Sequence, residues 1–141
     1  MHVTALWAPG HGPCLLRPLF VDRVSAGAPA TAEDLVEGFL DLNRYLIRNP
    51  AATFYVRVNG DSMTEAGIRA GDILIVDRAA VADDGDIIIA RLDDELTVKR
   101  LRIRAGEIWL ESENEAREAV RITKEMRFEV WGKVMHIIRS L

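Results

Sequence analysis

From residue 53 to residue 141, short runs rich in valine, isoleucine and leucine alternate with clusters of glycine and aspartate. Such runs are typical of β-strands, because branched side chains pack well on a pleated surface and Gly and Asp suit the turns. The short connections favour hairpins over βαβ units, so the pattern predicts a mostly β fold built on a coiled antiparallel sheet. The expected strands cover residues 53–58, 73–76, 86–92, 95–103, 107–111 and 127–138.

The segment before these strands has a helical period instead. Thr31 is a good N-cap residue, and Pro50 closes the segment because proline cannot continue a helix. We therefore expect one N-terminal helix between Thr31 and Pro50, with an apolar stripe that covers part of the β core. The stripe consists of Leu35, Phe39, Leu42 and Leu46.

Residues 1–30 show neither period. Prolines interrupt any long element there, and residues 25–30 are small and pliable. We interpret residues 1–30 as a flexible N-terminal arm and residues 31–141 as one β-rich domain.

The composition indicates in which cellular compartment this domain works and which partners it can bind. No apolar run approaches the ~20 residues that span a bilayer, and the single cysteine, Cys14, excludes an internal disulfide. Both features favour a cytoplasmic protein in a reducing compartment, with no membrane partner. The net charge of −4 disfavours a general nucleic-acid binder. Only a local basic patch is left as a candidate site for binding nucleic acid. That patch consists of Arg100, Arg102 and Arg104.

Ser62 lies in the turn 60–63, Gly-Asp-Ser-Met, where an Asp-Ser pair can serve local hydrogen bonding alone. A Ser-His-Asp triad is disfavoured, because His2 and His11 lie in the arm and His136 lies late in a strand. One cysteine and three scattered histidines predict no metal site. The sequence has no glycine-rich phosphate loop either, so we expect no cofactor.

Lys99 is the better partner for Ser62. On the expected strand 95–103 it shares a face with apolar residues, and burial lowers the pKa of a lysine. To act as a base near neutral pH, its pKa has to fall from about 10.4 to roughly 7–8. Neutral Lys99 would then accept the Ser62 hydroxyl proton, which is the Ser-Lys form of nucleophilic catalysis. The alternative, from the residues alone, is a strand lysine whose ammonium simply reaches solvent.

Four motifs together resemble the LexA/UmuD family of self-cleaving Ser-Lys peptidases. They are GDSM at 60–63, GDILIVD at 71–77, GDIIIA at 85–90 and TVKRL at 97–101. Shorter stretches are similar to the UmuD-type members in particular, and the likeness covers about residues 15–141. The resemblance implies a barrel-like Ser-Lys peptidase fold.

By this resemblance, Ser62 is the nucleophile and Lys99, thirty-seven residues later, is the general base. The N–H groups of Ser62 and Met63 are then candidate oxyanion donors. Ala26-Gly27 in the arm matches the self-cleavage site, since a small residue before the bond and glycine after it let extended backbone enter a narrow cleft. A flexible Ala/Gly linker would look the same locally, and only the downstream motifs favour the cleavage site.

The resemblance also implies a biological role. RecA filaments on single-stranded DNA would stimulate the cleavage, and the trimmed homodimer would serve as accessory subunit of a UmuC-type translesion DNA polymerase in the SOS response. The arm is too short for the helix-turn-helix domain of LexA-type repressors, so we expect no sequence-specific DNA binding. The alternative is a non-proteolytic polymerase-binding module in which Ser62 and Lys99 are relics.

Overall fold

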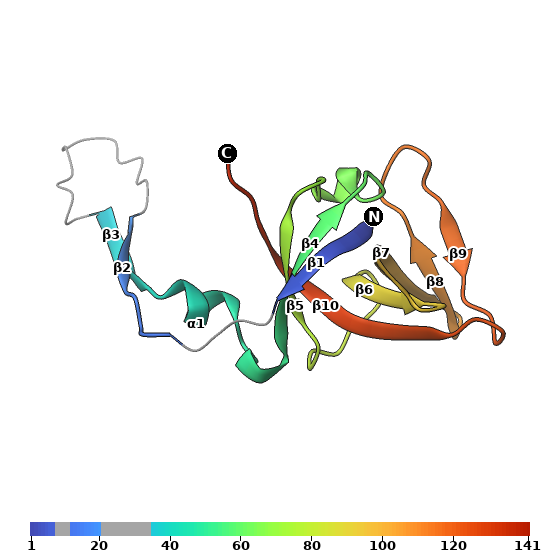
Figure 1. The fold of residues 1–141 in the computed structure, drawn as a ribbon, viewed down its shortest axis with the longest axis horizontal. Helices are drawn as coiled ribbons and strands as arrows, with labels where there is room; N and C mark the ends of the chain where they lie inside the picture. Colours follow the sequence, from blue (N-terminus) through green and yellow to red (C-terminus); the bar gives the residue numbers. More distant parts are fainter. Residues whose placement is uncertain (8–11, 21–34) are drawn as a thin grey trace. The chain divides into compact units, whose positions relative to one another are not determined.

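The computed structural model describes residues 1–7, 12–20 and 35–141 (Figure 1). They form two compact units: unit 1 holds the described residues of 1–9 and 49–141, and unit 2 those of 10–48. Strands dominate both units, although the sequence predicts them only between residues 53 and 138, within unit 1. The elements are β1 His2–Trp7, β2 Arg17–Phe20, β3 Val36–Leu40, α1 Leu42–Leu46, β4 Thr53–Asn59, β5 Ile73–Asp77, β6 Ile87–Leu92, β7 Glu95–Arg104, β8 Glu107–Glu111, β9 Ala119–Arg121 and β10 Phe128–Ile138.

Unit 1 is an antiparallel, barrel-like sheet. Its strands follow the order β1-β4-β5-β10-β6-β7-β8-β9, and β1 also pairs with β7. The pairing of His2 with Thr97 therefore closes a ring of β1, β4, β5, β10, β6 and β7. β8 and β9 extend the sheet from β7 (Figure 1). The predicted mostly β, barrel-like antiparallel fold is confirmed.

Two apolar clusters fill the interior of unit 1, because successive strand residues point to opposite faces of a sheet. The first cluster draws mainly on β4 and β5 and includes Met63 and Ile68, which are fully buried in the segment after β4. The second lies between β6, β7 and β8. Val98 belongs to the first cluster and Leu101 to the second, so β7 packs against both, and Lys99 lies between these two residues.

In unit 2, the helix expected between Thr31 and Pro50 is wrong over much of its described length. Val36–Leu40 forms β3, which pairs antiparallel with β2, and only Leu42–Leu46 is α-helical. Cross-strand hydrogen bonds satisfy the backbone of β3, and this tertiary pairing overrides a weak helical period. Asp41 caps α1 by accepting a hydrogen bond from the Asn43 N–H at 3.0 Å.

In unit 1, all six predicted strands are present with ends within one residue of expectation. The expectation that His2–Trp7 is irregular is wrong, because this segment forms strand β1 and pairs with β4. β9 is not among the predicted strands either. Within the described ranges, no helix is both long and apolar enough to cross a membrane.

Candidate active site

Ser62 lies in the turn after β4, and two neighbours determine the shape of this turn. Gly60 has a φ of 101°, a left-handed conformation that favours glycine, and a Cβ there would stand 3.2 Å from the Cα of Met1. Met63 is fully buried in the core and anchors the other side of the turn. The 3-10 turn Thr64–Ala66 follows directly. Ser62 is thus held, half-buried, between a glycine and a buried methionine.

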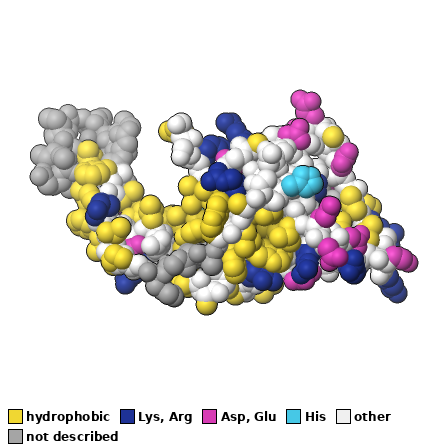
Figure 2. All heavy atoms as spheres, in the orientation of Figure 1, with side chains coloured by type: hydrophobic (Ala, Val, Ile, Leu, Met, Phe, Trp, Pro, Cys, Tyr) yellow, Lys and Arg dark blue, Asp and Glu magenta, His cyan; other side chains and the backbone are white. Residues whose placement is uncertain are grey.

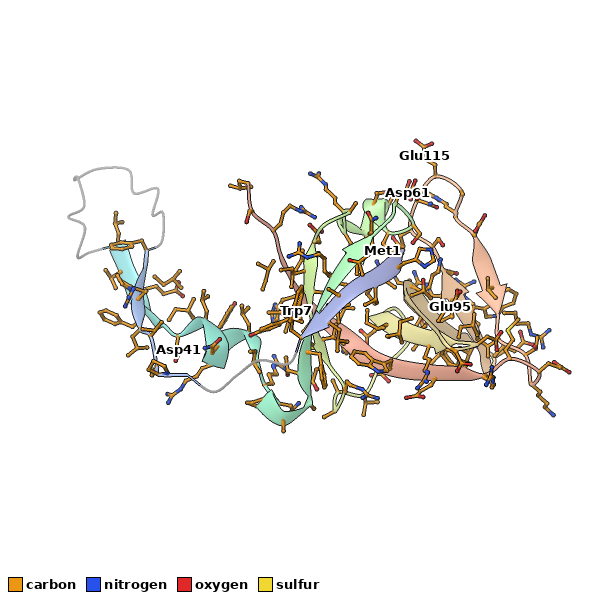
Figure 3. The ribbon with its side chains drawn as sticks, in the orientation of Figure 1. Met1, Trp7, Asp41, Asp61, Glu95 and Glu115 are labelled. Atoms are coloured by element: carbon orange, nitrogen blue, oxygen red, sulfur yellow. The ribbon has the colours of Figure 1, made fainter. Side chains whose placement is uncertain are left out.

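The first residue of the chain lies against Ser62. The Met1 ammonium donates a hydrogen bond of 2.5 Å to Ser62 Oγ, and the Met1 carbonyl accepts one from Thr97 Oγ1 at 2.8 Å. Figure 3 shows Met1 beside the turn that contains Asp61. Burial, and then the positive charge of Lys99, lowers the pKa of the Met1 ammonium. Met1 therefore connects the Ser62 turn to β7, the strand that carries Lys99.

Lys99 extends from β7 and is half-buried. Its Nζ donates a hydrogen bond of 2.6 Å to the Oγ of Ser112, a buried residue directly after β8. Burial lowers the pKa of Lys99, whereas the negative charge of Glu118 acts in the opposite direction. The lysine head group is thus engaged inside unit 1 and is easier to deprotonate than an exposed lysine.

The backbone of Glu113 links the two halves of the site. Its N–H donates to the Ser62 carbonyl at 2.6 Å, and its carbonyl accepts from the Glu65 N–H at 2.8 Å. The preceding residue, Ser112, accepts a hydrogen bond from Lys99. These contacts therefore bring Ser62 and Lys99 into one cluster. Within the described part of the chain, Lys99 Nζ donates to Ser112 and not to Ser62.

The candidates Ser62, Met63 and Lys99 therefore lie in one region of unit 1. The predicted cleavage site, Ala26-Gly27, lies outside the described residues. Sequence reasoning missed Ser112, because a single serine after a strand carries no local signal. The signal that could have found it is the hairpin register, in which Arg100 pairs with Glu111, because one further step sets Ser112 opposite Lys99.

The three arginines of the basic patch, Arg100, Arg102 and Arg104, form hydrogen bonds with carboxylates in the fold. Arg100 donates to Glu113 at 2.6 Å. Arg102 and Arg104 donate to the two carboxylate oxygens of Glu111 at 3.0 and 3.2 Å. Figure 2 shows acidic and basic side chains side by side over the β7–β9 end of unit 1. Among the residues that the structure describes, no cluster of His, Cys, Asp and Glu could hold a metal ion.

The β-rich fold agrees with comparison to known proteins. The chain belongs to the Peptidase S24-like family, whose model matches residues 18–135. The family membership predicted from the sequence motifs is thereby confirmed.

Three relatives show how far the similarity extends. The chain is 55% identical to Protein ImpA of Salmonella typhimurium over 89 residues, which are 63% of this chain and 61% of ImpA. It is 44% identical to the LexA repressor of Geotalea uraniireducens over 122 residues, 86% of this chain and 60% of that repressor. It is 35% identical to Protein MucA of Escherichia coli over 119 residues, 84% of this chain and 82% of MucA. The match thus spans less than two thirds of the length of ImpA.

Proposed function

We propose that this chain is a serine peptidase that cleaves its own N-terminal arm once. The observation that carries the proposal is the half-buried Lys99, with its lowered pKa, in the same cluster as Ser62 in a chain of the Peptidase S24-like family. A partly buried lysine loses its proton more readily than an exposed one, and a general base requires that loss. Ser62 is then the nucleophile and Ala26-Gly27 the cleaved bond.

The reaction needs only groups of this chain and water. Neutral Lys99 accepts the hydroxyl proton of Ser62 while Oγ attacks the Ala26 carbonyl carbon. The N–H groups of Ser62 and Met63, neither of which donates a hydrogen bond to another described residue, stabilise the resulting oxyanion. The protonated lysine then gives its proton to the Gly27 nitrogen as the peptide bond breaks. Water hydrolyses the remaining ester and restores Ser62.

The contacts in the structure fit a site before attack. Ser62 Oγ accepts a hydrogen bond from the Met1 ammonium, and Lys99 Nζ donates to Ser112. Proton transfer requires the Lys99 head group to turn toward Ser62. It also requires the Met1 ammonium to leave Oγ, because a cation bound to the hydroxyl oxygen weakens it as a nucleophile. Slow spontaneous cleavage that an activator accelerates fits this arrangement.

The cellular role that we propose is that of a UmuD-type protein in the cytoplasm. RecA filaments on single-stranded DNA stimulate the cleavage, and the trimmed homodimer acts as accessory subunit of a UmuC-type translesion DNA polymerase in the SOS response. The support is the family and the similarity to ImpA, MucA and the LexA repressor. The carboxylates paired with Arg100 and Arg102 fit a role through protein partners rather than through direct DNA binding.

Intact mass spectrometry of the chain incubated with RecA, ATP and single-stranded DNA tests this function. We expect products corresponding to residues 1–26 and 27–141, increasing with time. Ser62→Ala should give neither product, because it lacks the nucleophile. Ser140→Ala, which changes an exposed serine near the C-terminus, should cleave at the parental rate.

Two other outcomes would change the assignment in different ways. Cleavage at another bond would contradict Ala26-Gly27 as the site but leave Ser62 as the nucleophile. A parent chain that never cleaves, even with the activator, but still binds a UmuC-type polymerase would favour the non-proteolytic polymerase-binding module.

A further inference from the structure

Ser112 is a buried polar residue beside the base, and the mechanism above leaves it unused. It is 6% exposed, and its Oγ accepts the hydrogen bond from Lys99 Nζ at 2.6 Å. Its position follows from the β7–β8 hairpin, in which Arg100 pairs with Glu111. Continued by one residue beyond the strand, this register sets Ser112 opposite Lys99, and opposite residues in a sheet project from the same face. The contact is therefore a product of the hairpin register.

The residue after Ser112 ties the same segment to the nucleophile. The Glu113 N–H donates to the Ser62 carbonyl at 2.6 Å. The Glu113 carboxylate accepts from Arg100, the neighbour of Lys99 on β7, at 2.6 Å. The dipeptide Ser112-Glu113 thus contacts the lysine through a side chain and the serine turn through its backbone.

We propose that Ser112 is a positioning residue for the general base, a role that rests on the proposed self-cleavage. When one N–H of the Lys99 amine is held by Ser112 Oγ, the head group can turn only about that bond, which leaves the lone pair free to face Ser62. Without this acceptor, the flexible four-carbon stem of the lysine samples orientations in which the lone pair points elsewhere. Ser112 thus reduces the entropy that is lost when base and nucleophile align.

The contact also predicts the direction of a pH effect. Ser112 Oγ accepts a hydrogen bond from the ammonium form, so it favours the charged lysine. Burial of the lysine disfavours that charge, whereas the negative charge of the Glu118 carboxylate favours it. Removing the Ser112 hydroxyl leaves this carboxylate and the burial unchanged, so the pKa of Lys99 should fall further. A variant without the hydroxyl should therefore reach its maximal cleavage rate at lower pH, but that maximal rate should be smaller.

The test compares the parent with Ser112→Ala, Ser112→Thr and the control Ser140→Ala. Self-cleavage is followed without activator from neutral pH to about pH 10. We expect Ser112→Ala to lower the maximal rate about tenfold to a hundredfold, as for the loss of a hydrogen bond to a charged group. The midpoint of its pH profile should move down. Threonine keeps a hydroxyl acceptor and should recover most of the rate, and Ser140→Ala should match the parent.

A second readout follows the lysine itself. The chain has only three lysines, Lys99, Lys124 and Lys133, so lysine-selective isotope labelling gives few side-chain NMR signals to titrate. Ser112→Ala should lower the titration midpoint of Lys99. A purely structural role for Ser112 predicts no change in either the midpoint or the pH profile of cleavage.

The outcomes separate this role from the proposed function. A parent that cleaves, together with a folded Ser112→Ala that keeps the parental rate and midpoint, would overturn the positioning role alone. If Ser112→Ala does not fold, Ser112→Cys, which is similar in size but a weak acceptor, has to show the same losses. A parent that never cleaves would overturn the proposed function, and the positioning role with it.

Discussion

Lysine and arginine at position 99 differ in the pKa of the head group. A lysine whose pKa is lowered by burial can be neutral at a workable pH, whereas a guanidinium stays protonated. Lys99→Arg should therefore fold but not self-cleave at any pH. In the parent, the neutral fraction falls about tenfold per pH unit below the folded pKa. The rate without RecA, measured by intact mass, should thus rise steeply from neutral pH to about pH 10.

Lys133→Arg is the matched control for this substitution. Lys133 forms an ion pair with Asp86 at 2.9 Å, and arginine can maintain that pair, so the variant should cleave like the parent. Cleavage by a folded Lys99→Arg at even about a tenth of the parental rate would exclude Lys99 as the general base. The lysine would then have only a structural role.

Among the elements, β10 holds the barrel together, because it pairs with β5 on one side and with β6 on the other. A Cβ at Gly132 in β10 would stand 2.5 Å from Cγ1 of Val76, whose side chain is fully buried and has little room to move. Gly132→Ala should therefore lower the free energy of unfolding by about 1–3 kcal/mol. Guanidinium denaturation followed by tryptophan fluorescence and circular dichroism measures this change.

Gly38 in β3 provides a control, because a Cβ there would have no heavy atom within 4 Å. Gly38→Ala should leave stability unchanged or raise it by about 0.5 kcal/mol, since alanine restricts the unfolded chain more than glycine does. A Gly132→Ala protein as stable as the parent would contradict the close packing of β10 against β5.

At the scale of the whole molecule, the structure narrows where a homodimer interface can lie. β10 is a candidate strand for the contact in the proposed homodimer, but its Val130 and Val134 pack against the core of their own chain. Ile137 and Ile138 at the end of the strand are 40% and 43% exposed. We therefore expect a two-fold contact at this end of β10, and a dimer by light scattering at about tens of micromolar protein.

Substitutions at two isoleucines of nearly equal exposure, Ile138 and Ile103, test where the interface lies. Ile138→Asp should shift the protein toward monomer, because it places a charge in the expected contact. Ile103→Asp, at an isoleucine that is 42% exposed on β7, should leave the dimer intact. A parent that is monomeric under these conditions would rule out the homodimer, and equal effects of both substitutions would place the interface elsewhere.

The strands between Thr53 and Ile138 could be recognised from the chain alone. Strand periodicity depends on the order of neighbouring residues, so β4 to β8 and β10 were predictable without knowledge of their partners. The candidates Ser62 and Lys99 were predictable too, because they depend on residue type within recognisable motifs. Their role in cleavage remains a prediction.

The strands β1 and β3 and the contact of Ser112 with Lys99 were determined by pairing between segments that are far apart in the sequence. Val36–Leu40 lies within a stretch whose apolar residues have a helical period, yet its hydrogen bonds to Arg17–Phe20 outweigh that weak preference. His2–Trp7 becomes a strand because the edge of β4 offers it hydrogen-bond partners. Ser112 contacts Lys99 because a hairpin sets these residues across from each other. Each of these features depends on two segments meeting in space, and the residues of one segment do not specify which other segment will pair with it.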